Sequence, residues 1–138
     1  MQFDKFTIKS QEAIQAAQQL AQNKSHQEIQ SAHLARAILE QPEGVVVPVL
    51  QKMGVDPAII LMELNKLIDK IPQVSGSGAG QAYISAELQQ LLDKAFNTAS
   101  QMQDEFVSQE HLFLTLIKDG KSETSKMLRK KVCLFGCK

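Results

Sequence analysis

Apolar residues in the first half of the chain recur at helical spacing, and residues that start or stop helices separate the runs. This pattern predicts helices over residues 8–23, 31–41, 47–53 and 57–71. Thr7 precedes the first helix as its N-cap, and Asp56-Pro57 opens the fourth with an N-cap and a proline at the first helical position. The expected buried face of the first helix consists of Ile8, Ile14, Ala17, Leu20 and Ala21.

The same pattern returns 78 residues later. Thr7 then aligns with Ser85, Ala17 with Ala95, and the pair His33-Leu34 with His111-Leu112. Helices are expected again over residues 86–103, 109–118 and 122–128. Self-similarity at a fixed offset is typical of a duplicated structural unit. We therefore predict an all-α fold of about eight helices, arranged as two four-helix repeats related by a pseudo-twofold axis.

The predicted division treats residues 1–138 as a single domain. Repeat one covers 1–71, a Gly/Ser-rich connector covers 72–83, repeat two covers 84–131, and an atypical tail covers 132–138. Gly54 and Asp56-Pro57 mark a helix stop and a helix start in repeat one, whereas Val132 and Leu134-Phe135 stand at the equivalent places in the tail. The last helix of repeat two is therefore expected to be absent or altered, and we interpret the tail as truncated, frameshifted or otherwise changed.

Charge and hydropathy narrow the range of partners. The chain has 15 Lys and Arg against 15 Asp and Glu, so it lacks the basic excess on which phosphate-backbone binding depends. No apolar run reaches the roughly 20 residues of a membrane span, and the N-terminus lacks the apolar core of a secretory signal. We expect no nucleic acid partner, no membrane association and a cytoplasmic location.

Motifs that would indicate catalysis are missing. Gly120-Lys121-Ser122 ends like a phosphate-binding loop, but Thr115 stands where the first glycine belongs and a helix precedes it instead of a strand. We interpret this segment as a loop between helices in which Ser122 is an N-cap. The sequence predicts no catalytic or cofactor-binding residue.

Metal and redox chemistry have equally little support. His33 and His111 open equivalent helices, where a ring nitrogen can bond to the backbone, and no Cys or His lies at metal-site spacing from either. Cys133 and Cys137 fit neither a redox pair nor a zinc half-site, so free thiols are expected. We predict no metal ligand in this chain.

Three segments carry a family resemblance: Phe3–Thr7, Ile71–Val74 before the glycine-rich connector, and Asp104–Leu112. Together they resemble the N-terminal domain of the ClpB family of AAA+ protein disaggregase chaperones, over about residues 1–130. The resemblance implies an eight-helix domain tethered to two ATPase modules, which are absent here and which would carry ATP and Mg²⁺.

The resemblance also implies a function. Such a domain weakly engages exposed hydrophobic segments of unfolded or aggregated proteins, for refolding under heat stress together with a DnaK-type chaperone system. The full-length family members form hexameric rings through the absent modules, and the isolated domain is expected to be a monomer. Two other functions remain open: an adaptor-docking N-domain of a Clp protease unfoldase of the ClpA or ClpC type, and a stand-alone helical scaffold. An enzyme or metal protein is the last alternative.

Client-binding residues are carried over from the family to Thr7, Asp104 and Glu110, with Leu92 at a matching apolar position. Each has a structural explanation as well. Thr7 caps a helix, Glu110 lies in the first turn of a helix where a carboxylate is favourable, Asp104 ends a helix facing water, and Leu92 suits a core. Burying two or three client side chains gives about 1.5–3 kcal/mol each, while association costs about 4 kcal/mol or more, so weak binding is expected.

Overall fold

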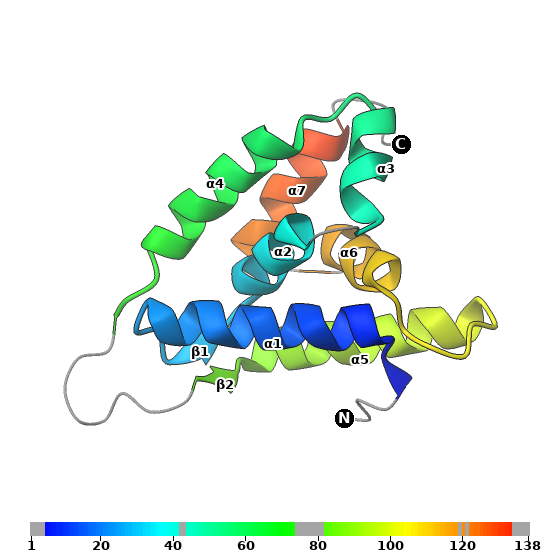
Figure 1. Ribbon diagram of the computed structural model, residues 1–138, viewed down its shortest axis with the longest axis horizontal. Coiled ribbons are helices and arrows are strands. Elements are labelled where there is room, and N and C mark those ends of the chain that lie inside the picture. The colour runs from blue at the N-terminus through cyan, green and yellow to red at the C-terminus, as the bar shows by residue number, and fades with distance from the viewer. Residues whose placement is uncertain (1–4, 42–43, 74–81, 119, 121, 134–138) are drawn as a thin grey trace.

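The computed structural model describes residues 5–41, 44–73, 82–118, 120 and 122–133. This part of the chain forms seven helices and one small sheet (Figure 1). The elements are α1 (Ile8–Asn23), β1 (Glu28–Ile29), α2 (Ser31–Glu40), α3 (Val46–Lys52), α4 (Pro57–Asp69), β2 (Tyr83–Ile84), α5 (Ala86–Gln101), α6 (Gln109–Lys118) and α7 (Glu123–Cys133). The predicted all-α class is confirmed.

The two repeats are joined by backbone hydrogen bonds that obey the 78-residue shift. β1 pairs in parallel with β2, and a parallel bridge joins Phe6 to Val107. The Ser85 N–H donates to the Ile29 carbonyl at 3.1 Å, and the equivalent Thr7 N–H donates to the Val107 carbonyl at 3.0 Å. In both cases the segment before the first helix of one repeat bonds to the segment before the second helix of the other. The pseudo-twofold relation is therefore visible in the hydrogen bonds themselves.

Helices α1 and α5 begin and end alike. Thr7 Oγ1 accepts from the Ser10 N–H at 3.1 Å, and Ser85 Oγ accepts from the Leu88 N–H at 3.2 Å. Each helix then ends through a non-glycine residue with positive φ, 58° at Ser25 and 61° at Gln103. Figure 1 shows the two helices running in opposite directions along the same side of the molecule, as a twofold relation requires.

The core lies around α2 and α6. Helix α2 is buried on nearly every side, because α1 and α4 both pack on it, while α6 is covered by α5 and α7. Helix α4 also contacts α7 and runs along the upper left side of the molecule as drawn in Figure 1. The largest fully buried side chains include Leu34, Ile38, Leu64, Leu92, Leu112 and Leu128.

Some expectations need correction. Ile8 is 74% exposed, because the buried face of α1 is set by Ser10, Ala13, Ile14, Ala17 and Ala21 and Ile8 lies on the opposite side of the helix. Helix α7 extends beyond residue 128 to Cys133, since Leu128 is buried and the Arg129 guanidinium donates to the Ile117 and Gly120 carbonyls at 2.9 Å. Most of the predicted connector (residues 74–81) and residues 134–138 of the tail lie outside the described residues.

The loop before α7 behaves as a helix start. The Ser125 N–H donates to Ser122 Oγ at 3.3 Å, so Ser122 is an N-cap as predicted. Gly120 is buried in the preceding turn, and a Cβ added there would overlap the Ser125 hydroxyl and lie 2.9 Å from the Leu116 carbonyl oxygen. The α6–α7 loop thus requires glycine for space.

We expect Gly120→Ala to lower the free energy of unfolding by about 1–3 kcal/mol, as overpacking does elsewhere. Urea denaturation followed by far-UV circular dichroism measures this loss. Gly44→Ala is the matched control, because a Cβ at Gly44 would meet Gln109 Oε1 only at 3.2 Å and a flexible side chain can give way. Equal losses in the two variants would contradict the steric account.

Candidate functional site

A histidine fixes the loop that follows α5. His111 Nδ1 accepts from the Ser108 N–H at 2.9 Å, so the proton of the neutral ring lies on Nε2. That Nε2 is 2.8 Å from Asp104 Oδ2, and the ring therefore donates to the carboxylate. His111 ties the loop carrying Asp104 to the first turn of α6, and both ring nitrogens are occupied by these contacts.

Repeat one has the same arrangement with a different partner. His33 Nδ1 accepts from the Gln30 N–H at 2.9 Å, and its Nε2 lies 2.9 Å from His26 Nδ1. The 78-residue shift aligns His26 with Asp104, so an imidazole replaces a carboxylate. Burial, and then the nearby His26 and Arg36, lowers the pKa of His33 to about 4. Burial and Lys24 also lower the pKa of His26, so both rings are neutral at pH 7.

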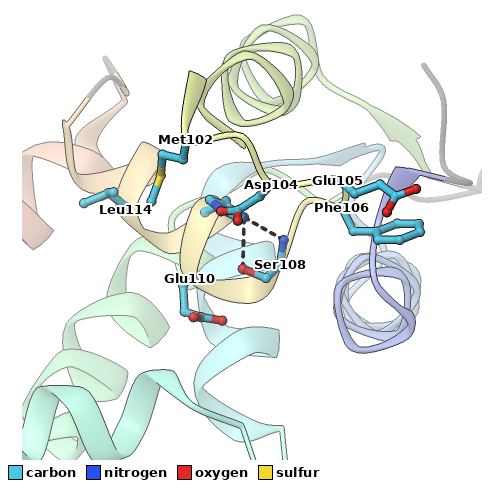
Figure 2. Close-up of a pocket in the computed structure, with 8 residues that line it drawn as sticks. Met102, Asp104, Glu105, Phe106, Ser108, Glu110 and Leu114 are labelled. Atoms are coloured by element: carbon cyan, nitrogen blue, oxygen red, sulfur yellow. Dashed lines mark hydrogen bonds and ion pairs between the residues drawn. The ribbon is translucent and has the colours of Figure 1, made fainter. Parts of the chain in front are cut away.

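A pocket of about 360 Å³ opens beside the His111–Asp104 pair (Figure 2). Its lining combines three carboxylates with apolar side chains that are partly exposed to solvent. Met102 is 55% exposed and Leu114 39%, and Phe106 is exposed to a similar degree. The lining residues are Met102, Asp104, Glu105, Phe106, Ser108, Glu110, His111 and Leu114.

Two of the four residues predicted for client binding line this pocket, namely Asp104 and Glu110. Thr7 lies beside it, because its N–H bonds to the Val107 carbonyl within the lining segment, and its hydroxyl caps α1. Leu92 is elsewhere. It is fully buried in the core and presents no surface to a partner in this conformation.

Sequence reasoning missed Met102, Glu105, Phe106 and Leu114. The offset contained a usable signal, because Met102 aligns with Lys24 and Leu114 aligns with Arg36. Apolar residues thus stand in repeat two at places where repeat one has cations. A helix surface that exchanges a charged residue for an apolar one in this way is a candidate contact surface.

The arrangement suits binding better than bond chemistry. The ring of His111 can act as a base only by giving up its contact to the backbone or to Asp104. Within the described residues, no three His, Cys, Asp or Glu side chains are grouped as a metal site would need. The pocket combines an apolar rim with three carboxylates. Across the described ranges, no helix has the length and apolar character to cross a membrane.

Residues 5–131 match the family model of the Clp repeat (R) N-terminal domain. The chain belongs to this family. The match covers both repeats of the Clp N-domain, including the pocket and the pair of histidines. The duplicated architecture described above is thus that of the family.

A curated relative agrees with this assignment, and solved structures share the fold. The chain is 43% identical over 116 residues to the chaperone protein ClpB of Bacillus cereus, covering 83% of this chain but 13% of that protein's length. The N-terminal domain of Hsp104 from Candida albicans has a TM-score of 0.78 at 22% identity, covering 93% of this chain and 81% of that one. A complex of the ClpV N-domain with a VipB peptide has a TM-score of 0.76 at 18% identity, with coverages of 94% and 80%.

Burial lowers the pKa of His26 and of His33, so we expect the folded domain to lose stability in acid. Because the folded pKa of His33 lies near 4 and the ordinary value is 6.5, the unfolded chain binds the proton first as pH falls. The stability contributed by the neutral ring is complete above pH 6.5 and falls between pH 6.5 and 4, by up to about 3 kcal/mol. Urea denaturation across this pH range measures the slope.

The variant His26→Asp gives His33 the partner that His111 already has. A carboxylate favours the protonated ring, so we expect a smaller loss of stability between pH 6.5 and 4 than in the parent chain. His26→Asn is the control, because an amide leaves His33 without a charged partner and most of its slope remains. The account is wrong if all three proteins lose stability equally over this range.

Proposed function

We propose that this Clp N-domain is a non-catalytic client-binding module of a ClpB-type, ATP-dependent disaggregase. It weakly engages exposed hydrophobic segments of unfolded or aggregated proteins, which are then refolded under heat stress. The observation that carries the proposal is the pocket beside His111, where Met102, Phe106 and Leu114 stay exposed around three carboxylates. Apolar side chains gathered at one pocket favour contact with a partner.

The comparisons support this proposal at the level of the family. A ClpV N-domain of similar fold has been captured with a peptide, so this fold can hold a short segment of another chain. The identity of 43% to a ClpB chaperone favours the disaggregase branch. The chain spans only 13% of that relative's length, so the remaining activity belongs to parts outside it.

The proposed contacts centre on the pocket. Asp104 and Glu110 supply charge at its wall, and Thr7 lies at its edge through the Val107 backbone. We leave Leu92 out of the contact surface, because it is fully buried. Replacing Leu92 by a small polar residue is expected to cost about 2–5 kcal/mol of stability, so such a variant tests folding and not binding.

Low affinity fits the wider proposal. Half-exposed apolar side chains gain only part of the roughly 1.5–3 kcal/mol of full burial, and association costs about 4 kcal/mol or more. Several copies on a ring compensate through avidity. In the full-length protein we propose a cytoplasmic hexamer, driven by ATP and Mg²⁺ in its ATPase modules and working with a DnaK-type chaperone system.

The pair Met102→Ser and Met62→Ser tests the pocket. Met102 lines it and is 55% exposed, while Met62 on α4 is 52% exposed and does not line it. We expect Met102→Ser to weaken binding of a labelled, permanently unfolded protein about three- to tenfold, because part of an apolar contact is lost. Met62→Ser should bind like the parent chain. Fluorescence anisotropy with reduced, carboxymethylated lactalbumin gives both dissociation constants.

Equal weakening of binding by Met102→Ser and Met62→Ser would contradict the proposal, because the pocket would then contribute no more to binding than another exposed part of the surface. A second contrary result is absence of binding to the unfolded protein together with recovery of one small folded adaptor, which would favour the protease-unfoldase alternative.

A further inference from the structure

The buried histidine pair of repeat one holds both ends of a short segment, residues 26–30. His26 begins the segment, and its Nδ1 lies 2.9 Å from His33 Nε2. Gln30 ends the segment, and its N–H donates to His33 Nδ1 at 2.9 Å. One imidazole of α2 therefore binds the segment at each end. The pair of His26 and His33 is here called the histidine clasp.

The clasped segment carries one of the two backbone junctions between the repeats. The Tyr83 N–H donates to the Gln27 carbonyl at 3.1 Å. The Ser85 N–H donates to the Ile29 carbonyl, also at 3.1 Å. Both carbonyls lie between the two ends that His33 holds. Displacement of residues 26–30 would therefore break the hydrogen bonds of the β1–β2 junction.

Neither ring of the clasp can take up a proton without losing a hydrogen bond. His33 Nδ1 accepts from the Gln30 N–H, so the proton of the neutral ring lies on Nε2 and points at His26 Nδ1. His26 Nδ1 is then an acceptor, and the proton of that ring lies on its Nε2. An added proton must go to one of the two Nδ1 atoms, where an N–H already points. Protonation of the pair therefore releases one end of the clasp.

The cations around the clasp oppose a further positive charge. Lys24 at the end of α1 lowers the pKa of both histidines, and Arg36 on α2 lowers that of His33. Burial acts in the same direction and is the largest cause for each ring, so that the pKa of His33 falls to about 4. Acid therefore supplies a proton that the closed clasp accepts poorly.

The carboxylates of the neighbouring elements have other partners. Asp69 at the end of α4 raises the pKa of His26, but its exposed carboxylate lies 3.6 Å from Lys24 Nζ. Glu28 on β1 accepts from the Tyr83 hydroxyl at 3.4 Å, and Glu87 on α5 accepts from a hydroxyl of α2. Within the described ranges, neither ring of the clasp has a carboxylate as its hydrogen-bond partner.

The second junction between the repeats has the same geometry with different end groups. His111 holds the segment from Asp104 to Ser108 at both ends. Within that segment, the Val107 carbonyl accepts from the Thr7 N–H at 3.0 Å. The 78-residue shift thus exchanges the imidazole of repeat one for a carboxylate and its glutamine for a serine.

These end groups allow His111 to take up a proton. A proton added at His111 Nδ1 can be donated to Ser108 Oγ, which lies 3.0 Å away. The Nε2–H remains directed at Asp104, whose carboxylate balances the charge of the ring. The segment thus stays held at both ends when the ring is charged.

We propose that the histidine clasp is an acid-released latch on the β1–β2 junction. Uptake of a proton by His26 or His33 frees residues 26–30 and opens this junction, while the junction between Thr7 and Val107 stays closed. The repeats then remain joined through one junction instead of two. No partner molecule takes part, so this inference does not depend on the proposed function.

Amide hydrogen exchange at pH 7 and at pH 5, followed by ¹H–¹⁵N NMR, tests the proposal. Opening returns the pKa of His33 from about 4 to the ordinary 6.5, so acid favours the open form. After correction for the intrinsic pH dependence of exchange, the protection factors of Tyr83 and Ser85 should fall about twentyfold. Those of Thr7 and Val107, the donors at the other junction, should fall less than about threefold.

Two variants of His26 supply the matched comparison. His26→Asp gives His33 the kind of partner that His111 has, so the difference between the two junctions should shrink to less than about threefold. His26→Asn removes one imidazole without adding a charge, so Tyr83 and Ser85 should remain the acid-sensitive amides.

Equal falls in protection at the two junctions would overturn the proposal, because acid would then weaken the domain as a whole. Unchanged protection of Tyr83 and Ser85 at pH 5 would overturn it as well, and so would an acid response that His26→Asp leaves intact. The comparison of the two junctions uses the parent chain, so it decides the matter even where His26→Asp destabilises the fold.

Discussion

The structure depends on an exchange of backbone hydrogen bonds between its two halves. The segment before α1 bonds to the segment before α6, and the segment before α5 bonds to the segment before α2. Neither half can satisfy these groups alone, and buried backbone groups left without partners are costly. The exchange therefore fixes the repeats in one relative orientation. Everything that distinguishes their surfaces must come from side chains and from the helices packed on this frame.

The pocket arises from such a distinction. The same histidine-to-backbone bond occurs at His33 and at His111. In repeat one the histidine is fully buried and paired with a second imidazole, whereas in repeat two it meets a carboxylate beside a pocket. Within the described residues, the duplicated frame thus carries a buried histidine pair in repeat one and a histidine–carboxylate pair beside a pocket in repeat two. The apolar side chains that line the pocket are outside the buried core.

Much of the frame could be predicted from the sequence, because caps and helical periodicity are local. Thr7 and Ser85 indicate where the long helices start, and the 78-residue shift relates them. The strands could not be predicted, since two residues are too few to show alternation. Ile8 was misplaced because it lies opposite the buried face of α1, which small residues such as Ser10 and Ala13 form. Family likeness led to Asp104 and Glu110, but Met102 follows α5 and Leu114 lies on α6, and only the folded chain brings them to one pocket.

The central claim is that contact with a partner occurs at the pocket beside His111 in repeat two and not at the equivalent stretch of repeat one. Amide chemical-shift mapping by ¹H–¹⁵N NMR, during titration with an unfolded protein, tests it most directly. We predict that the shifts concentrate between Met102 and Leu114, while the equivalent stretch from Lys24 to Arg36 stays unchanged. Shifts of equal size in the two stretches, or none between Met102 and Leu114, would contradict the account.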